Sequence, residues 1–490
     1  MVFEKSKRAN LVLWFIFLLS SPMIAAFGYV NLYDNDPHFV PIQRILTNKP
    51  LDSLSCAQCI RQPHLYYYVS ANLIRALSVH HVYSQLNIAR SLNVISGILI
   101  LFLIFSVIKN SSYSNRVKII GFGLIALNPT LVTINSQISN DSFTILFSTL
   151  TLLFFIKLLR KTNYINFFLM LLFTVLALAT KSTALIIFIG ISLSLIVKSL
   201  ANFRRKKQMM TFLGFSLLYV IIVLLIMYLF IPYYSLRFNP LYDFIFFIEH
   251  SVNEILGVKI WDIPLNDQKI FERKVFTNAL GRNYSYRPGY TSFKESILSF
   301  NYLTLVESPN IHYFKDGRYV NRNSFWIILF GETHSVHFSG IPLAWRSQNR
   351  RSDDIERVIF VLAVIPTAAF VLSILLILKD ALTSVYKKRT SYFSENDDWI
   401  YVIYVFGYLL AQIIGFYLYI NFEWASFRFF LPPILIYSLL LCTALQRMYS
   451  YFDGKKHVMK ALEVITVCLM ISYILDLMVL FIDIYNKTMV

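Results

Sequence analysis

The amino-acid sequence predicts an all-α polytopic membrane protein with about eleven transmembrane helices and two large extracytoplasmic loops. Three observations support this fold class. Of the 490 residues, 57% are hydrophobic and only 15% are charged, whereas a soluble domain carries about 25% charged residues. The mean hydropathy of the chain is +0.58. Apolar runs of about 17–25 residues, the length that crosses the hydrocarbon core of a bilayer, recur along the whole chain.

Eleven apolar runs are long enough to cross a bilayer. They lie at about residues 10–31, 91–108, 118–135, 142–158, 164–180, 183–199, 210–232, 357–379, 399–421, 428–446 and 459–485. The first run follows Lys5, Lys7 and Arg8, as the apolar part of a signal peptide would. However, the apolar stretch from Leu11 to Val30 is longer than the 7–15 residues typical of a signal peptide. We therefore expect a retained helix.

The orientation of the bundle follows from the short loops between these runs. Basic residues gather in every second loop, at residues 5–8, 109–118, 157–161, 198–207, 379–389 and 447–456. Loops rich in Lys and Arg stay in the cytoplasm, so the N-terminus is predicted inside and the C-terminus outside. The short outside turns carry little beyond Lys181 and Arg428. Topology and anionic lipid headgroups thus account for the net charge of +18 without a nucleic-acid partner.

The same topology divides the chain into three parts. Residues 1–231 form an N-terminal transmembrane module that includes the first extracytoplasmic loop, residues 32–90. Residues 232–356 form a second, large extracytoplasmic loop, and residues 357–490 form the C-terminal transmembrane helices. A structureless loop of this length is uncommon, so we expect it to fold over the bundle. Leu65 to Ser78 resembles an amphipathic helix, which either lies at the lipid interface or packs on the bundle.

The four cysteines fall into two pairs. Cys442 and Cys468 lie in apolar helices and are expected to be inert thiols. Cys56 and Cys59 lie in the first outside loop, where an oxidising compartment favours a local disulfide. Free thiols and half of a metal site remain alternatives, the latter with His64, His80 or His81 as further ligands. We expect no cofactor, with a divalent metal as the alternative.

An acidic motif directly after the first helix is the strongest candidate for chemistry. Asp34 and Asp36 lie two residues apart beside His38. A carboxylate whose pKa is raised by burial or by an acidic neighbour can accept a proton from an attacking hydroxyl group. The alternative is a solvated turn or a helix cap.

Cations that could bind a lipid phosphate lie on the same side of the membrane. The first loop carries Arg44, Lys49, Arg61, Arg75 and Arg90. Lys181 occupies a very short outside turn, and Arg428 opens the tenth apolar run. Arginine suits bidentate contacts to phosphate, whereas side chains of this kind also snorkel to the interface without a ligand. Asn140 and Asp141 add a polar turn on the same side, and Asp476 is an acidic residue within the last run.

The order of several motifs resembles the GT-C glycosyltransferases, in particular the branch of protein O-mannosyltransferases and lipid A aminoarabinose transferases. That family carries Asp-Glu followed by His or Arg after its first helix. Asp34 matches the first acid and His38-Phe39 the following pair, whereas Asn35 replaces the second acid and leaves Asp36 as a substitute. The family's Pro-Pro-Leu-Tyr-Tyr element resembles Pro63-His64-Leu65-Tyr66-Tyr67.

Three further motifs follow in the family's order. Leu127-Asn128-Pro129 leading to Ser139-Asn140-Asp141 resembles its connection between the third and fourth helices. Ala179-Thr180-Lys181-Ser182 resembles its lysine-bearing turn, and Arg428-Phe429-Phe430-Leu431-Pro432 resembles its Arg-Tyr-x-x-Pro element. Each motif is weak alone, but together they cover most of the chain.

The resemblance implies an inverting enzyme that moves a sugar from a polyprenyl phosphate to an acceptor on a glycan, lipid or protein. Asp34 would act as general base, with Asp36 and His38 orienting it or the acceptor. The donor phosphate would be bound by Lys181, Arg428 and Arg61, and the remaining substrate contacts by His64, Tyr66, Tyr67, Asn140 and Asp141. The bacterial inner membrane is favoured over the endoplasmic reticulum.

A different class remains open, namely a transporter or flippase that moves a lipid-linked sugar without cleaving a bond. Such proteins are often built from inverted repeats with matching broken helices. The sequence shows no internal repeat, which argues against this alternative.

Overall fold

The computed structural model describes residues 2–30, 38–51, 62–203, 205–230, 300, 302–307, 312–315, 318–321, 324–335, 351–386, 398–419 and 430–489. The elements in chain order are α1 (Val2–Val30), α2 (Phe39–Leu46), α4 (Leu65–Ala76), α5 (Val82–Lys109), α6 (Asn115–Ala126), α7 (Pro129–Ile134), α8 (Asp141–Arg160), α9 (Tyr164–Thr180), η1 (Ser182–Ala184), α10 (Leu185–Ala201), α11 (Lys206–Phe230), α16 (Tyr302–Glu307), β1 (His312–Lys315), β2 (Arg318–Asn321), α17 (Phe325–His334), α18 (Arg351–Tyr386), α20 (Asp398–Tyr419), α21 (Ile434–Tyr451) and α22 (Lys456–Met489).

Each of the eleven predicted apolar runs contains helix, and the chain is an integral membrane protein. Among the described residues, seven helical segments are long and apolar enough to cross a membrane, and they lie in α1, α5, α8, η1 with α10, α11, α18 and α22. Two shorter apolar helices span Tyr164–Thr180 and Trp399–Ala411. The exact number of crossings stays a prediction.

The third predicted run is broken rather than continuous. Helix α6 ends at Ala126 and α7 begins at Pro129. The side chain of Asn128 accepts a hydrogen bond of 3.0 Å from the backbone N–H of Leu131, so it caps α7. Proline at the first position of α7 cannot donate a backbone hydrogen bond, which suits a helix start and not a helix interior. The break positions the turn that leads into α8.

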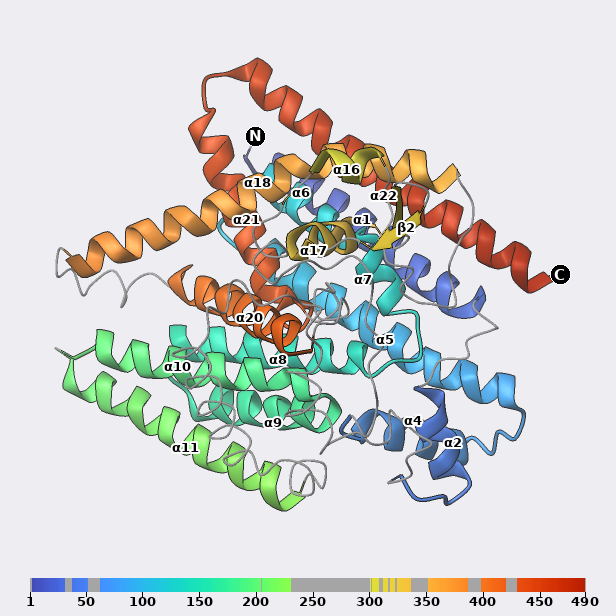
Figure 1. Cartoon of the computed structure of the whole chain (residues 1–490). Coiled ribbons are helices and arrows are strands. Elements are labelled where there is room, and N and C mark those ends of the chain that lie inside the picture. Colours follow the sequence, from blue (N-terminus) through green and yellow to red (C-terminus); the bar gives the residue numbers. More distant parts are fainter. Residues whose placement is uncertain are drawn as a thin grey trace.

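The long helices form two groups around one apolar core. Helices α8, α9, α10 and α11 lie side by side, as Figure 1 shows in green and cyan. Helix α1 packs against α5 and α6, and α18 packs against α20, α21 and α22. A smaller apolar cluster joins α2, α4 and the start of α5. In α4, Tyr66, Ser70 and Ile74 are buried while Tyr68 is half exposed. The helix predicted at residues 65–78 therefore packs on the bundle, as one of the two alternatives requires.

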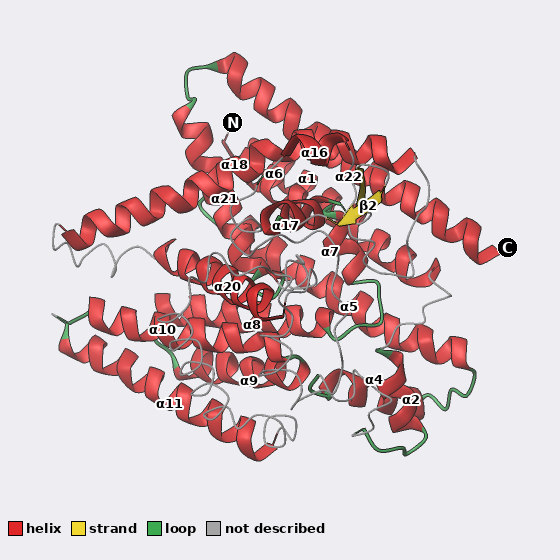
Figure 2. Ribbon diagram, in the orientation of Figure 1, coloured by secondary structure: helices red, strands yellow, loops and turns green. Residues whose placement is uncertain are grey.

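The large second loop has secondary structure of its own. Its described residues form α16, α17 and an antiparallel hairpin in which His312 of β1 pairs with Asn321 of β2. This hairpin is the exception to the helical structure of the described chain, and it appears as the yellow arrows in Figure 2. Helix α17 packs against α7, α16 and α18, which ties the loop to the bundle.

Candidate active site

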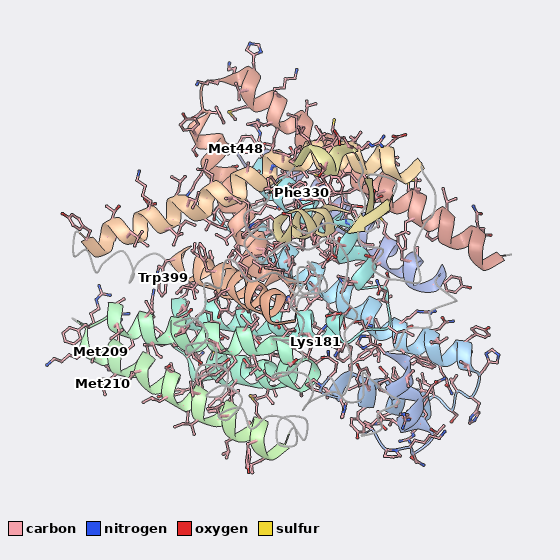
Figure 3. The ribbon with its side chains drawn as sticks, viewed as in Figure 1. Lys181, Met209, Met210, Phe330, Trp399 and Met448 are labelled. Carbon is pink, nitrogen blue, oxygen red and sulfur yellow. The ribbon has the colours of Figure 1, made fainter. Side chains whose placement is uncertain are left out.

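A buried ion pair joins two helix ends that lie 40 residues apart in sequence. Lys181 follows the last residue of α9, and Asp141 is the first residue of α8. The ammonium group of Lys181 contacts Oδ1 of Asp141, and the side chains are only 5% and 9% exposed. Lys181 adopts an extended backbone conformation with φ −156°, which ends α9 and turns the side chain toward Asp141. Figure 3 places Lys181 near the ends of α8 and α9.

The turn before α8 fixes both partners of the ion pair. The hydroxyl of Ser139 donates to Oδ2 of Asp141 at 2.7 Å and accepts from its backbone N–H at 3.1 Å. The amide of Asn140 donates to the carbonyl of Thr180 at 3.0 Å, which holds the residue next to Lys181. The predicted residues Asn140, Asp141 and Lys181 are therefore brought together in one buried cluster.

Helix α5 closes the other side of this turn. Asn93 is fully buried, and its amide donates to the carbonyls of Gln137 and Ser139, the latter at 2.9 Å. The same amide donates to the hydroxyl of Tyr66 at 3.2 Å. Tyr66 donates in turn to the carbonyl of Ala89 at 3.2 Å. A predicted substrate residue, Tyr66, is thus part of the framework that supports the ion pair.

The two motifs of the first loop meet through His38 and Tyr67. Nδ1 of His38 lies 2.7 Å from the Tyr67 hydroxyl in a hydrogen bond, and the ring of Tyr67 is fully buried. The ring of His64 lies 6.3 Å from that of Tyr67. The ring of Tyr67 packs edge-on against Tyr66 at 5.6 Å. Contacts therefore connect His38 through Tyr67 and Tyr66 to Asn93. The family-like element at residues 63–67 thereby positions the histidine of the acidic motif.

The cations of the first loop differ in what they contact. Arg44 donates to the carbonyl of Pro50 at 2.8 Å, and Arg75 donates to the side chain of Asn48 at 2.9 Å. These two contacts hold the short loop after α2. Arg90 is different because it lies within α5, only 2% exposed, one turn before Asn93. A buried guanidinium in a membrane helix is costly and usually serves function.

Several predicted site residues lie outside the described residues. These are Asp34, Asp36, Arg61, Arg428, Cys56 and Cys59. Their roles, and the disulfide between the two cysteines, remain predictions. Cys442 and Cys468 are free thiols. Within the described ranges, no group of three His, Cys, Asp or Glu side chains could hold a metal ion.

A second feature is an apolar cavity of about 460 Å³ between α6, α17, α18, α20 and α21. Asn128, Thr367, His334 and Tyr473 are among the polar residues that line it. The ring nitrogens of His334 contact the Tyr473 hydroxyl at 2.5 Å and the Thr367 hydroxyl at 3.1 Å. Burial lowers the pKa of His334 to about 3, so the imidazole is neutral at physiological pH. We call these three residues the His334 network.

Sequence reasoning missed Asn93, the contacts of the Ser139 hydroxyl with Asp141 and the burial of Arg90. A usable signal existed, because Asn87, Arg90 and Asn93 recur every three residues at the start of an apolar run. Residues at this spacing share one face of a helix. A polar face on a membrane helix predicts contact with other polar groups and not with lipid.

Comparison with known proteins agrees with the sequence resemblance. Residues 78–242, about a third of the chain, match the family model of dolichyl-phosphate-mannose-protein mannosyltransferase. The matched segment contains Asn93, Asp141 and Lys181, and it confirms the predicted resemblance to the GT-C glycosyltransferases. The comparison with curated proteins gave no match.

A solved structure resembles the chain more distantly. It is the archaeal oligosaccharyltransferase AglB from Archaeoglobus fulgidus in complex with an inhibitory peptide and a dolichol-phosphate. The sequences are 11% identical, with a TM-score of 0.43. The match covers 97% of this chain but only 56% of AglB, so the chain spans little more than half the length of that protein.

Proposed function

We propose that this protein is a membrane glycosyltransferase that moves a sugar from a polyprenyl phosphate to an acceptor on the extracytoplasmic side. The observation that carries the proposal is the buried pair of Lys181 and Asp141, held within the segment that matches the mannosyltransferase family. Burial of an ion pair rarely adds net stability compared with well-packed apolar residues. An ammonium group kept at such a cost fits a site for an anionic ligand.

The reaction needs a group that takes a proton and a group that stabilises the leaving phosphate. The acceptor hydroxyl would lose its proton to Asp34 as its oxygen bonds to the anomeric carbon. The bond from that carbon to the phosphate oxygen breaks, and its electron pair leaves with the polyprenyl phosphate. Asp36 and the Tyr67-bonded His38 would orient the base or the acceptor.

Lys181 can serve the phosphate without leaving Asp141. An ammonium group has three N–H donors, so one can stay with the carboxylate while another contacts a phosphate oxygen. Arg428 and Arg61 would add contacts to the same phosphate. Arg90 joins them as a buried guanidinium one turn from Asn93. His64, Tyr67 and Asn140 would border the sugar.

The apolar cavity offers room for part of the prenyl chain. Asn128 lines the cavity, and α7 runs from Pro129 to Ile134 toward the turn that carries Asp141. Six helical residues rise about 9 Å, a length that a prenyl chain spans easily. The apolar lining then replaces lipid around the chain while the phosphate stays at the polar turn.

A transfer assay in detergent tests the proposal. The purified protein would be incubated with a panel of radiolabelled sugars on polyprenyl phosphates and with lysates as acceptor source. We expect release of free polyprenyl phosphate and labelled acceptor. A transporter would bind the donor and leave it intact, because it cleaves no bond. Detergent removes the two sides of the membrane, so the assay detects transfer and not transport. Mass spectrometry of lipids that co-purify identifies the donor chain independently.

A further inference from the structure

We infer that Asn93 is a positioning residue that holds Asp141, and through it Lys181, in the geometry required for donor binding. This inference rests on the proposed function. Asn93 touches neither member of the ion pair directly. Its contacts instead fix the turn between α7 and α8 on which Asp141 sits.

The first argument is the number of groups that meet at one amide. The side-chain nitrogen of Asn93 contacts the carbonyls of Gln137 and Ser139 and the hydroxyl of Tyr66. An amide has only two N–H donors, so these acceptors share them. Carbonyl groups in a buried turn have no helical partner and need donors from elsewhere. Asn93 supplies them from a neighbouring helix.

The second argument is the close approach of α5 to this turn. Gly97 lies one turn beyond Asn93 and on the same face of α5. A Cβ atom on Gly97 would lie 2.5 Å from the Cβ of Asn135, too close for any larger residue without a shift. The backbone of α5 at Gly97 therefore packs directly against the Asn135 side chain at the end of α7, one turn from Asn93.

The third argument is the path from Asn93 to the charges. Ser139 accepts from Asn93 through its carbonyl and donates to Asp141 through its hydroxyl. Asp141 then pairs with Lys181. On the other side, Tyr66 leads to Tyr67 and His38. One buried amide thus lies between the predicted phosphate site and the histidine beside the predicted base.

The test compares Asn93→Leu with Thr174→Val. Both changes remove a buried polar group at nearly constant shape, and Thr174 bonds the Tyr219 hydroxyl at 3.0 Å away from the candidate site. Ser139→Ala, which breaks only the path to Asp141, is a milder second variant. Folding is checked by thermal unfolding in detergent.

The main readout is modification of Lys181 by an amine reagent, quantified by mass spectrometry against the exposed Lys207. We expect modification of Lys181 to rise roughly fivefold in Asn93→Leu, the factor that corresponds to the net free energy of one hydrogen bond. The rise should be smaller in Ser139→Ala. Thr174→Val should match the wild type. Unchanged modification of Lys181 in both Asn93→Leu and Ser139→Ala would overturn the inference.

Binding of polyprenyl phosphate is measured on the same samples. We expect weaker binding in Asn93→Leu and Ser139→Ala and wild-type binding in Thr174→Val. Equal affinity in all variants would also overturn the positioning role. A wild-type protein that does not bind polyprenyl phosphate would refute the proposed function instead, while the modification of Lys181 would still decide what Asn93 holds in place.

Discussion

Two buried polar networks in this bundle differ in charge, and the difference indicates what each is for. The pair of Lys181 and Asp141 is ionic and nearly inaccessible. The His334 network joins a neutral imidazole to two hydroxyl groups. The two lie apart, as Figure 3 shows by the positions of Lys181 and of Phe330 in the helix that carries His334.

The neutral network is explained by structure alone. Its hydrogen bonds join α17 to α18 and α22, and Asn128 and Thr130 donate to the carbonyls of Thr333 and Glu332 at 2.8 and 2.6 Å. These bonds attach a loop helix to the membrane bundle. The ionic pair is not explained in this way, because apolar residues of similar volume would often serve stability as well or better. Charge retained at that cost agrees with the proposed role of Lys181 in binding phosphate.

The largest expected effect tests whether the charged region performs catalysis. Asp34→Asn keeps the shape of the side chain but cannot take a proton. We expect a folded protein that binds donor, with sugar transfer reduced by roughly a hundredfold or more, as for loss of a general base. Asp36→Asn should be milder. If Asp34 only caps a turn, asparagine caps nearly as well and activity is kept. Near-normal turnover in Asp34→Asn with a loss in Asp36→Asn would assign the base to Asp36.

The second prediction separates charge from stability in the ionic pair. Lys181→Ala leaves a buried carboxylate and should lower the free energy of unfolding by about 3–5 kcal/mol. The double change Lys181→Gln with Asp141→Asn keeps a hydrogen bond without charge and should recover most of that loss. Donor affinity should stay low in both proteins. Thermal unfolding and binding of polyprenyl phosphate are the measurements, and full recovery of binding in the neutral pair would contradict a phosphate contact.

The third prediction concerns Arg428, a further cation predicted for the phosphate. A charge-assisted contact contributes about 1.5–3 kcal/mol, so Arg428→Ala should weaken donor binding at least tenfold. Arg428→Lys should restore only part of the affinity, since the planar fork of arginine is lost. Equilibrium binding of polyprenyl phosphate decides this. Wild-type affinity in the alanine variant would remove Arg428 from the site.

The fourth prediction uses the neutral network. Burial lowers the pKa of His334 from 6.5 to about 3, so the unfolded state binds a proton first as the pH falls. Stability should therefore decline as the pH falls from above 7 toward 3, and at pH 5.5 it should lie about 1.4 kcal/mol below its value at high pH. His334→Gln lacks the titrating group and should flatten this part of the profile. An unchanged slope in that variant would assign it to other groups.

The sequence was sufficient for the helical fold because membrane helices require long apolar runs, which hydropathy detects. The pattern of basic loops also predicted that Asn140, Asp141 and Lys181 lie on the same side of the membrane. The break at Asn128 was missed because apolar residues continue through it. Asn93 was missed because two of its three partners are carbonyls more than 40 residues away, and a carbonyl has no sequence signature. The position of α17 depends on similarly distant contacts.

The last prediction, which has the smallest expected effect, tests whether the cavity beside the neutral network holds the lipid chain. Ile374 lines the cavity and is 7% exposed, while its neighbour Leu375 is 55% exposed on the outer face of α18. Ile374→Phe should displace part of a prenyl chain, and Leu375→Phe adds the same ring to the outer surface as a control. Each buried CH₂ group contributes about 0.8 kcal/mol, so the KM for a long-chain donor should rise at least about fourfold in Ile374→Phe alone. A donor with a single short prenyl unit should not distinguish the two variants, because its chain need not reach past α7. An equal rise for both chain lengths would mean that the added ring disturbs the polar turn and that the chain lies elsewhere.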